Sequence, residues 1–260
     1  MRKALDISRA VFSPGKKLLG LVIKAANRPE IIQSLAGLLE KHGTKIMYIH
    51  AVSAGEDLKL MVYLDISEAK VKVEEIVKDV ASAKAIKDVV SFKPLFDGFI
   101  IDVVHFPVLA LGSRAWIARE SVLKGIFRDI KVALGDAGKV FLYYQGKKVG
   151  EDVYEDYRKI ASSKKEILAL FSALVKATGW GIIEEISFSP LERTYTIKIS
   201  DSIECTMSKP SKEPSGYFFK GVLAGLLSKI ENKDVVVEEV KCIAKGDECC
   251  LFIARVGKWR

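Results

Sequence analysis

The stretch "YFFKGVLAGLLSKIENKDVVVEEVKCIAKGDECCLF", residues 217–252, determines how the second half of the chain folds. Its apolar first part, with glycines spaced four apart, predicts a helix over residues 217–231. Two strands follow, over residues 234–244 and 248–256, and a turn at Gly246-Asp247 joins them. The stretch therefore predicts one helix followed by a β-hairpin that carries three cysteines.

Upstream of this stretch, the second half predicts further helices and strands. Residues 98–118 are apolar and strand-like, but Pro107 interrupts them, which favours an edge strand or a linker with a strand. Two helices broken at Gly135-Asp136, a third helix, two strands and a polar loop follow, over residues 119–160, 163–179, 180–190, 193–206 and 207–216. This order predicts an α+β domain.

The first half reads as a small βαββαβ unit. Its elements are a strand, a helix with Pro29 in its first turn, two strands, a second helix and a last strand, over residues 18–26, 27–43, 44–53, 57–66, 70–83 and 86–95. A unit of this order packs both helices on one face of a four-stranded antiparallel sheet. We therefore expect a ferredoxin-like arrangement.

The phrase "ANRPEIIQSLAGLLEKHG" followed by "TKIMYIHA" resembles the ACT domain, over about residues 17–95. The resemblance implies a small-ligand regulatory module that pairs with a copy of itself. The family loop often reads Asp-Arg-Pro-Gly, and here the matching residues are Asn27, Arg28, Pro29 and Glu30. Because Glu30 places a carboxylate where a ligand's own carboxylate would sit, dimerisation or scaffolding is the favoured role over amino-acid binding.

Length and composition set the frame for these units. A chain of 260 residues is long enough for two cores, so we expect an ACT-like domain over residues 1–97 and a second domain over 98–260. The net charge of +8 comes from lysines spread along both halves, without an Arg-rich arm or a zinc-finger spacing. Direct nucleic-acid binding is therefore disfavoured. Abundant Lys, Glu, Ile and Val with very few amides are typical of a thermophile.

The N-terminal segment and the apolar runs bear on localisation. No run approaches the roughly 20 apolar residues of a membrane span, and "MRKALDISRAVFSPGKK" holds no signal-peptide core. We therefore expect a cytoplasmic protein. In such a protein, four cysteines favour metal binding or buried thiols over a disulfide framework.

Two phrases of the second half resemble the 4-vinyl reductase domain: "FFKGVLAGLLSKIENKDVVVEEVKCIAKGDECCLF" and "LGDAGKVFLYYQGKKVGEDV". The resemblance covers about residues 98–256. That family includes the hydrocarbon-sensing domains of phenol-type bacterial activators and a bacteriochlorophyll-pathway protein, and its fold is similar to a subunit of a vesicle-tethering particle. The resemblance implies a fold class of α+β with a ferredoxin-like βαββαβ (ACT-like) domain followed by a 4-vinyl-reductase-type ligand-binding domain. Function does not follow from the fold alone.

The hairpin cysteines suggest a metal site. A three-residue loop around Gly246-Asp247 would set Cys242 directly opposite Cys250 on one face, where two thiolates could share a zinc ion. The resemblance implies Glu239, Cys242 and Cys250 as ligands. The family's fourth ligand is a Cys at the position of Gly216, so Cys205 would have to supply the missing thiolate through a folded-back polar loop.

Strand parity and two alternatives qualify this metal hypothesis. Glu239 and Cys242 are an odd number of positions apart, so a regular strand would place them on opposite faces unless a β-bulge lies between them. A hairpin with free buried thiols and a Cys242–Cys250 disulfide are the alternatives. Cys249 faces away from Cys250. A bound zinc would be structural, because the sequence offers no nearby His or open-site carboxylate pair.

The sequence holds few signs of an enzyme. It lacks a Gly-rich dinucleotide loop, a phosphate-binding loop and a nucleophile elbow, and reductase chemistry needs an electron donor. The pairs Gly146/Gly150 and Gly221/Gly225 each clear one helix face, either for close packing or for a ligand. An apolar pocket could be lined by Phe127, Tyr144, Phe171, Trp180 and Phe218.

These observations favour a cytoplasmic regulatory protein. Its C-terminal domain would bind a small hydrophobic or aromatic molecule, with zinc as a possible structural cofactor, and its ACT-like domain would give dimerisation, as a homodimer, or a second input. No DNA-binding or ATPase segment is present, so the output would pass through a partner. The alternatives are an enzyme or accessory protein that handles a hydrophobic or tetrapyrrole-like substrate, and a ligand-free scaffold.

Overall fold

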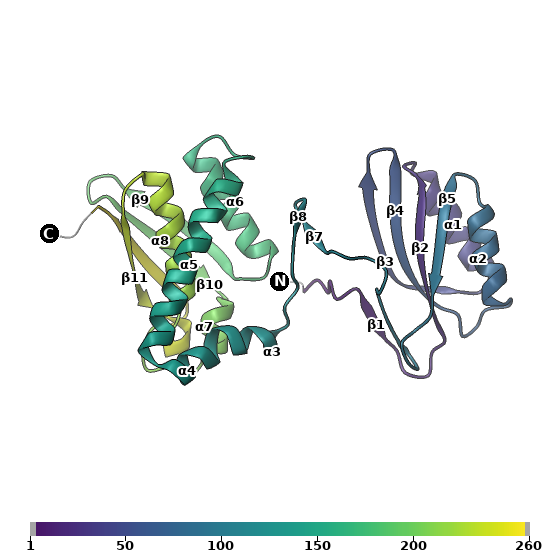
Figure 1. Ribbon diagram of the computed structural model, residues 1–260, viewed down its shortest axis with the longest axis horizontal. Coiled ribbons are helices and arrows are strands. Elements are labelled where there is room, and N and C mark those ends of the chain that lie inside the picture. The colour runs from purple at the N-terminus through teal and green to yellow at the C-terminus, as the bar shows by residue number, and fades with distance from the viewer. Residues whose placement is uncertain (1–3, 258–260) are drawn as a thin grey trace. The chain divides into compact units, whose positions relative to one another are not determined.

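The computed structural model describes residues 4–257, which fall into two compact units that divide between Trp116 and Ile117 (Figure 1). The strand β6 (Phe99–Ile101) belongs to the first unit because it pairs with β1 (Ala10–Phe12). The family domains predicted over residues 1–97 and 98–260 stay a prediction beside this division. In the described part of the chain, no helix is both long and apolar enough to cross a membrane.

The first unit contains the predicted four-stranded antiparallel sheet with both helices on one face (Figure 1). Across the sheet the strands run β3 (Lys45–Ala54), β4 (Asp57–Asp65), β2 (Leu18–Ala26) and β5 (Ile86–Phe92), and the helices are α1 (Glu30–Lys41) and α2 (Val73–Ser82). Alternate residues of β2 and β4 pack against buried residues of the two helices, which is the main core of the unit.

The opposite face of this sheet carries a smaller apolar cluster. Leu18, Met61 and Tyr63 pack there with Ile100 of β6. The Tyr63 hydroxyl donates a 2.6 Å hydrogen bond to the carbonyl of Arg9. Beyond β6 the apolar residues 98–118 form only two more short strands, β7 (Leu109–Ala110) and β8 (Ser113–Arg114), so most of this segment connects the units rather than extending a sheet.

The second unit is an α+β domain with a four-stranded antiparallel sheet in the order β11-β12-β10-β9. Its strands are β9 (Ile182–Ser189), β10 (Thr194–Ser200), β11 (Val235–Lys241) and β12 (Cys250–Val256). Its helical segments are α3 (Glu120–Leu123), the π-helical η1 (Lys124–Asp129), α4 (Ile130–Leu134), α5 (Asp136–Tyr157), α6 (Lys164–Ala177), α7 (Ile203–Met207), α8 (Tyr217–Glu231) and the 3-10 turn η2 (Ile243–Lys245). The helix and hairpin predicted from residues 217–256 are both present.

Four glycines bring α5 and α8 into backbone contact. A Cβ on Gly146 or Gly150 would overlap the carbonyl oxygen of Phe218 or Val222 on α8. In return, a Cβ on Gly221 or Gly225 would overlap carbonyl oxygens of α5. Of the two roles open to these glycines, close helix packing is therefore the one that the structure shows.

Candidate metal centre

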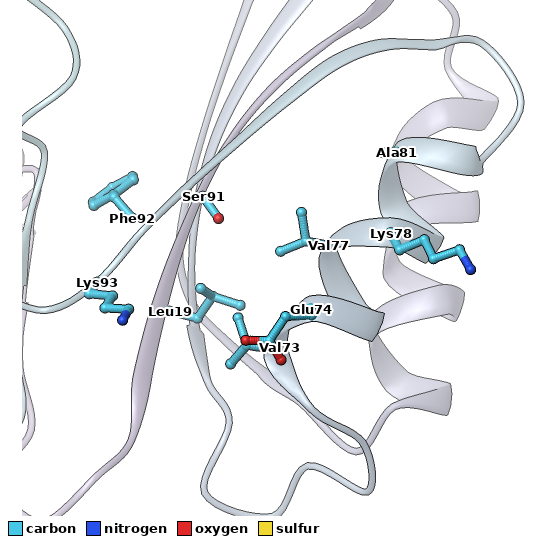
Figure 2. A pocket seen from close by; sticks show the side chains of 9 residues that line it. All are labelled: Leu19, Val73, Glu74, Val77, Lys78, Ala81, Ser91, Phe92 and Lys93. Carbon is cyan, nitrogen blue, oxygen red and sulfur yellow. The ribbon is translucent and has the colours of Figure 1, made fainter.

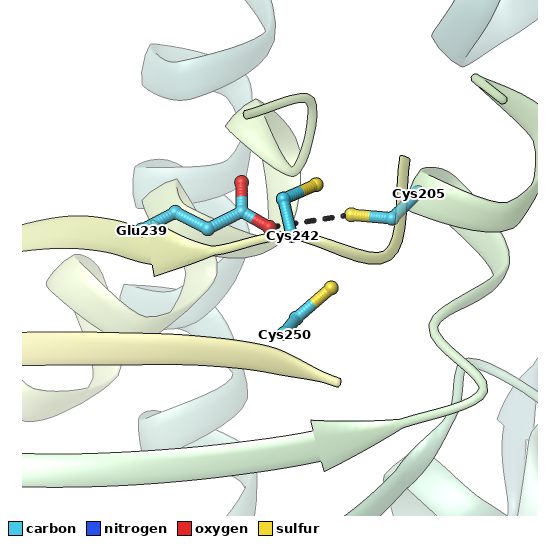
Figure 3. Close-up of side chains that lie close together, drawn as sticks. All are labelled: Cys205, Glu239, Cys242 and Cys250. Atoms are coloured by element: carbon cyan, nitrogen blue, oxygen red, sulfur yellow. Dashed lines mark hydrogen bonds between the residues drawn. The ribbon is translucent and has the colours of Figure 1, made fainter. Parts of the chain in front are cut away.

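Four side chains converge at one end of the second sheet: Cys205, Glu239, Cys242 and Cys250 (Figure 3). One ligand atom from each lies within 4.8 Å of the others, and all four residues are buried. They come from α7, β11, the residue that begins η2, and the first residue of β12. Three sulfur atoms and one carboxylate are therefore close enough to hold one metal ion.

Two local features aim Glu239 and Cys205 at the same point. The register of β11 against β12 shifts between Glu239 and Lys241, so Val240 is an extra residue and the bulge removes the parity conflict expected for a regular strand. Cys205 was expected at the end of a strand, but after β10 the chain turns into the short helix α7. This helix buries Cys205 completely and brings its Sγ to 3.4 Å from Oε1 of Glu239.

The hairpin differs from the predicted one. Cys242 does not lie opposite Cys250 within paired strands, because the last pair is Lys241 with Leu251 and Cys242 already begins the turn η2. The Asp247 carboxylate accepts a 2.8 Å hydrogen bond from the Cys242 N–H and so stabilises this wider loop. All four cysteines are free thiols.

Backbone N–H groups of the loop point at the sulfur atoms. The N–H of Ile243 donates to Cys250 Sγ, and the N–H of Ala244 donates to Cys242 Sγ, each at 3.4 Å. Such donors stabilise negative charge on sulfur. The loop therefore favours thiolates, the form in which cysteine binds a metal.

Gly216 explains how Cys205 fits into the cluster. Its N–H donates a 2.9 Å hydrogen bond to Glu239 Oε2, and a Cβ placed on it would lie 3.2 Å from Cys205 Sγ. A cysteine at this position would therefore compete with Cys205 for the same space. The side chain from α7 takes the place that a residue at the start of α8 would otherwise occupy.

Ionisation within the cluster is uneven. Burial raises the pKa of Glu239 to about 8, and the neighbouring Cys242 adds to this shift. Hydrogen bonds from Cys205 and Cys250 lower the pKa of the Cys242 thiol, whereas its bond to Cys242 raises the pKa of Cys205. Without a cation, the group thus retains protons on some of its donors, and a metal ion would have to displace them.

Two charged side chains that the sequence did not single out surround the cluster. Lys131 of α4 donates hydrogen bonds to the Ser215 carbonyl and hydroxyl, each at 2.8 Å, and to the Ser208 hydroxyl at 3.1 Å. Burial lowers the pKa of Lys131, and nearby Glu204 opposes this shift. Glu204 is fully buried and accepts 3.0 Å bonds from the N–H groups of Phe218 and Phe219, so it caps the start of α8.

The five aromatic residues predicted to line a pocket separate into three groups. Phe127, Trp180 and Phe218 form one cluster with ring centroids 5.2 to 5.4 Å apart. Phe171 stacks on Phe219 in the core, and Tyr144 is 62% exposed on α5. A hollow of about 230 Å³ beside the metal cluster has other lining residues: Pro214, Gly216, Tyr217, Lys220, Glu238 and Glu239.

Two family models match the chain, the ACT domain over residues 21–89 and the 4-vinyl reductase domain over residues 195–256. The uncharacterized proteins MJ0150 and MJ0745 of Methanocaldococcus jannaschii are 28% and 30% identical over 134 and 130 residues, half of this chain in each case. The matches span 74% of MJ0150 and 59% of MJ0745.

Among solved structures, the phenol-responsive sensory domain of the transcription activator PoxR with phenol is 17% identical, with a TM-score of 0.49. The match covers 56% of this chain and 79% of that one. With the two domain matches in order along the sequence, the chain is a 4-vinyl reductase domain protein with an N-terminal ACT-like domain.

Proposed function

We propose that this protein is a cytoplasmic regulatory protein whose 4-vinyl reductase domain binds a small hydrophobic or aromatic molecule. One observation carries the proposal. The ring of Phe218 belongs to the aromatic cluster with Phe127 and Trp180, while its N–H is bound by Glu204, the residue next to Cys205. A molecule that displaced these rings would therefore act on the start of α8 and on the metal cluster together.

The aromatic cluster is suited to rearrangement. Phe127 lies in the π-helical segment η1, and such segments are frequent at functional sites. Trp180 is only partly buried, so one side of the cluster is within reach of solvent. The proposal thus places the ligand between η1 and Trp180.

Calorimetric titration with phenol tests this placement, because phenol combines one apolar ring with one hydroxyl. Saturable binding that is lost on replacing Trp180 by Ala and kept on replacing the exposed Trp116 by Ala supports the proposal. Equal binding by both variants contradicts it. Native mass spectrometry of the purified protein would show a co-purified ligand directly.

Zinc is the metal that we propose for the cluster. Three thiolates with one carboxylate are a soft donor set that suits a tetrahedral zinc ion. Cys205, Glu239, Cys242 and Cys250 would hold it, and the ion would fasten the hairpin to α7 and to the start of α8. About one zinc per chain by elemental analysis, lost in the Cys242→Ser variant, supports this assignment.

We propose a homodimer formed through the first unit. The edge strand β3 pairs with a neighbour on one side only among the described strands, and Ile46, Ile49 and Val52 along it are 43 to 46% exposed. An apolar edge of this kind pairs readily with a second copy. Sedimentation of the wild type as a dimer and of Ile49→Glu as a monomer supports the proposal, and a monomeric wild type refutes it.

A ligand-free scaffold is the second candidate. It is supported by the filled interior of the second unit, where α5 and α8 touch along the four glycines and Phe171 is packed in the core. No response to phenol together with an unchanged dimer would favour this role.

A further inference from the structure

The edge of the first sheet opposite β3 carries a groove of about 410 Å³ between β5 and α2 (Figure 2). Its floor is Leu19 of β2, and its helical wall is the apolar row Val73, Val77 and Ala81. The strand side is Ser91, Phe92 and Lys93. The groove is therefore apolar inside and runs along the end of an edge strand.

Two small residues keep this groove open. Ser91 lies across from Val77 in Figure 2, and Phe92 points to the other face of the sheet. Ala81 ends the helical row with one methyl group and is exposed. A larger apolar side chain at either position would fill the space that the other β5 residue on this face, Val89, fills by packing into the core.

The edge of β5 is protected in its first half only. Lys87 and Asp88 are charged, and the register with β2 shifts at this point, which is how natural sheets prevent pairing with another chain. The second half, residues 89–92, is uncharged and lacks proline. Within the described residues, β5 pairs with β2 alone, so the backbone groups of its outer side are open to another strand.

The charges around the groove limit what it accepts. Lys78 and Lys93 line it together with Glu74, so basic groups outnumber acidic ones. An extended segment beside β5 would send alternate side chains against the row of Val73, Val77 and Ala81. The remaining side chains would lie near the lysines, where carboxylates are favoured.

We propose that this groove binds an extended acidic peptide of a partner protein, which adds to β5 as a fifth strand. Backbone hydrogen bonds to the outer side of residues 89–92 supply the affinity, and the apolar groove selects side chains at alternate positions. This surface lies on the edge opposite the dimerisation strand β3, so the dimer and the peptide complex can form together.

Fluorescence anisotropy of the full-length protein tests the proposal, with a labelled octapeptide of alternating glutamate and valine as the probe. We expect saturable binding, and about tenfold weaker binding of the same peptide N-methylated at alternate residues, because it loses its donors to the edge. Ala81→Glu, at an exposed helix position, should weaken binding about fivefold through carboxylate repulsion. Ala81→Lys, of similar length, should not weaken it.

The control is Ile49→Glu on the β3 edge, which should leave peptide binding unchanged even where it abolishes the dimer. Absence of saturable binding, equal affinity of the N-methylated peptide, or loss of binding in Ile49→Glu alone would each overturn the proposal. The last outcome would move the peptide to β3 and leave the groove at β5 without this role.

Discussion

A Cβ placed on Gly216 would lie 3.2 Å from Sγ of Cys205, so these two residues, one before α8 and one in α7, compete for one position beside Glu239. The absence of a side chain at Gly216 is what allows the thiol of α7 to enter the cluster. The donor has moved to another element while its place in space is kept.

This exchange predicts a rescue experiment. Cys205→Ser should lose zinc binding, and Cys205→Ser combined with Gly216→Cys should recover it, because the new thiol begins at the site the old one reached. Zinc per chain is measured by elemental analysis after dialysis. Gly216→Cys alone is the matched control and should bind zinc less well than the wild type because its side chain crowds Cys205. A double variant without zinc would show that the two positions are not equivalent.

Lys131 should control how firmly the metal is held. Its ammonium group tethers Ser215 and Ser208 and balances the negative charge of the buried donors and of Glu204. Replacing Lys131 by Met keeps the length of the side chain and removes the charge, so zinc release to a colorimetric chelator should become about tenfold faster. Lys148→Met, an exposed lysine of α5, is the control and should release zinc at the wild-type rate.

Much of the fold could be predicted because periodicity and turn residues act locally. The strand Leu18–Ala26 and the helix Tyr217–Glu231 have the boundaries expected from their patterns. The helix α7 could not be predicted, since its five residues carry no periodic signal and continue an apolar strand. The segment 98–118 was also read as more strand than it contains, because its apolar residues are exposed connections rather than a sheet face.

The candidate site was predictable in its residues and unpredictable in its surroundings. Cys242 and Cys250 are near in sequence, and a bulge before Cys242 follows from strand parity. Lys131 could not be identified, because a lysine in a short helix normally faces solvent and its burial depends on how α4 packs on the loop at Ser215. The aromatic residues failed as one set since Tyr144 and Phe171 lie on helix faces that composition cannot distinguish.

The contact between α5 and α8 predicts a strong effect of one methyl group. Gly225→Ala would push a Cβ into the Lys147 carbonyl, and both neighbours are backbone, so the helices must separate. We expect a loss of about 3 kcal/mol in the free energy of unfolding, measured by urea denaturation followed by circular dichroism. Gly125→Ala in η1, where a Cβ meets nothing within 4 Å, should change this free energy by less than about 1 kcal/mol.

The last prediction concerns the acid stability of the first unit. Asp65 accepts hydrogen bonds from Ser67 and pairs with Lys16 at 3.1 Å, and these contacts, Ser67 first, lower the pKa of Asp65 from 3.8 to about 2. Because the folded-state pKa is the lower one, this carboxylate stabilises the fold above about pH 4, and the contribution is lost as the pH falls from about 4 to about 2. Urea midpoints measured across this window should fall less steeply in Asp65→Asn than in the wild type. Asp88→Asn, at an exposed carboxylate of β5, should keep the wild-type slope, and the same slope in Asp65→Asn would contradict the assignment.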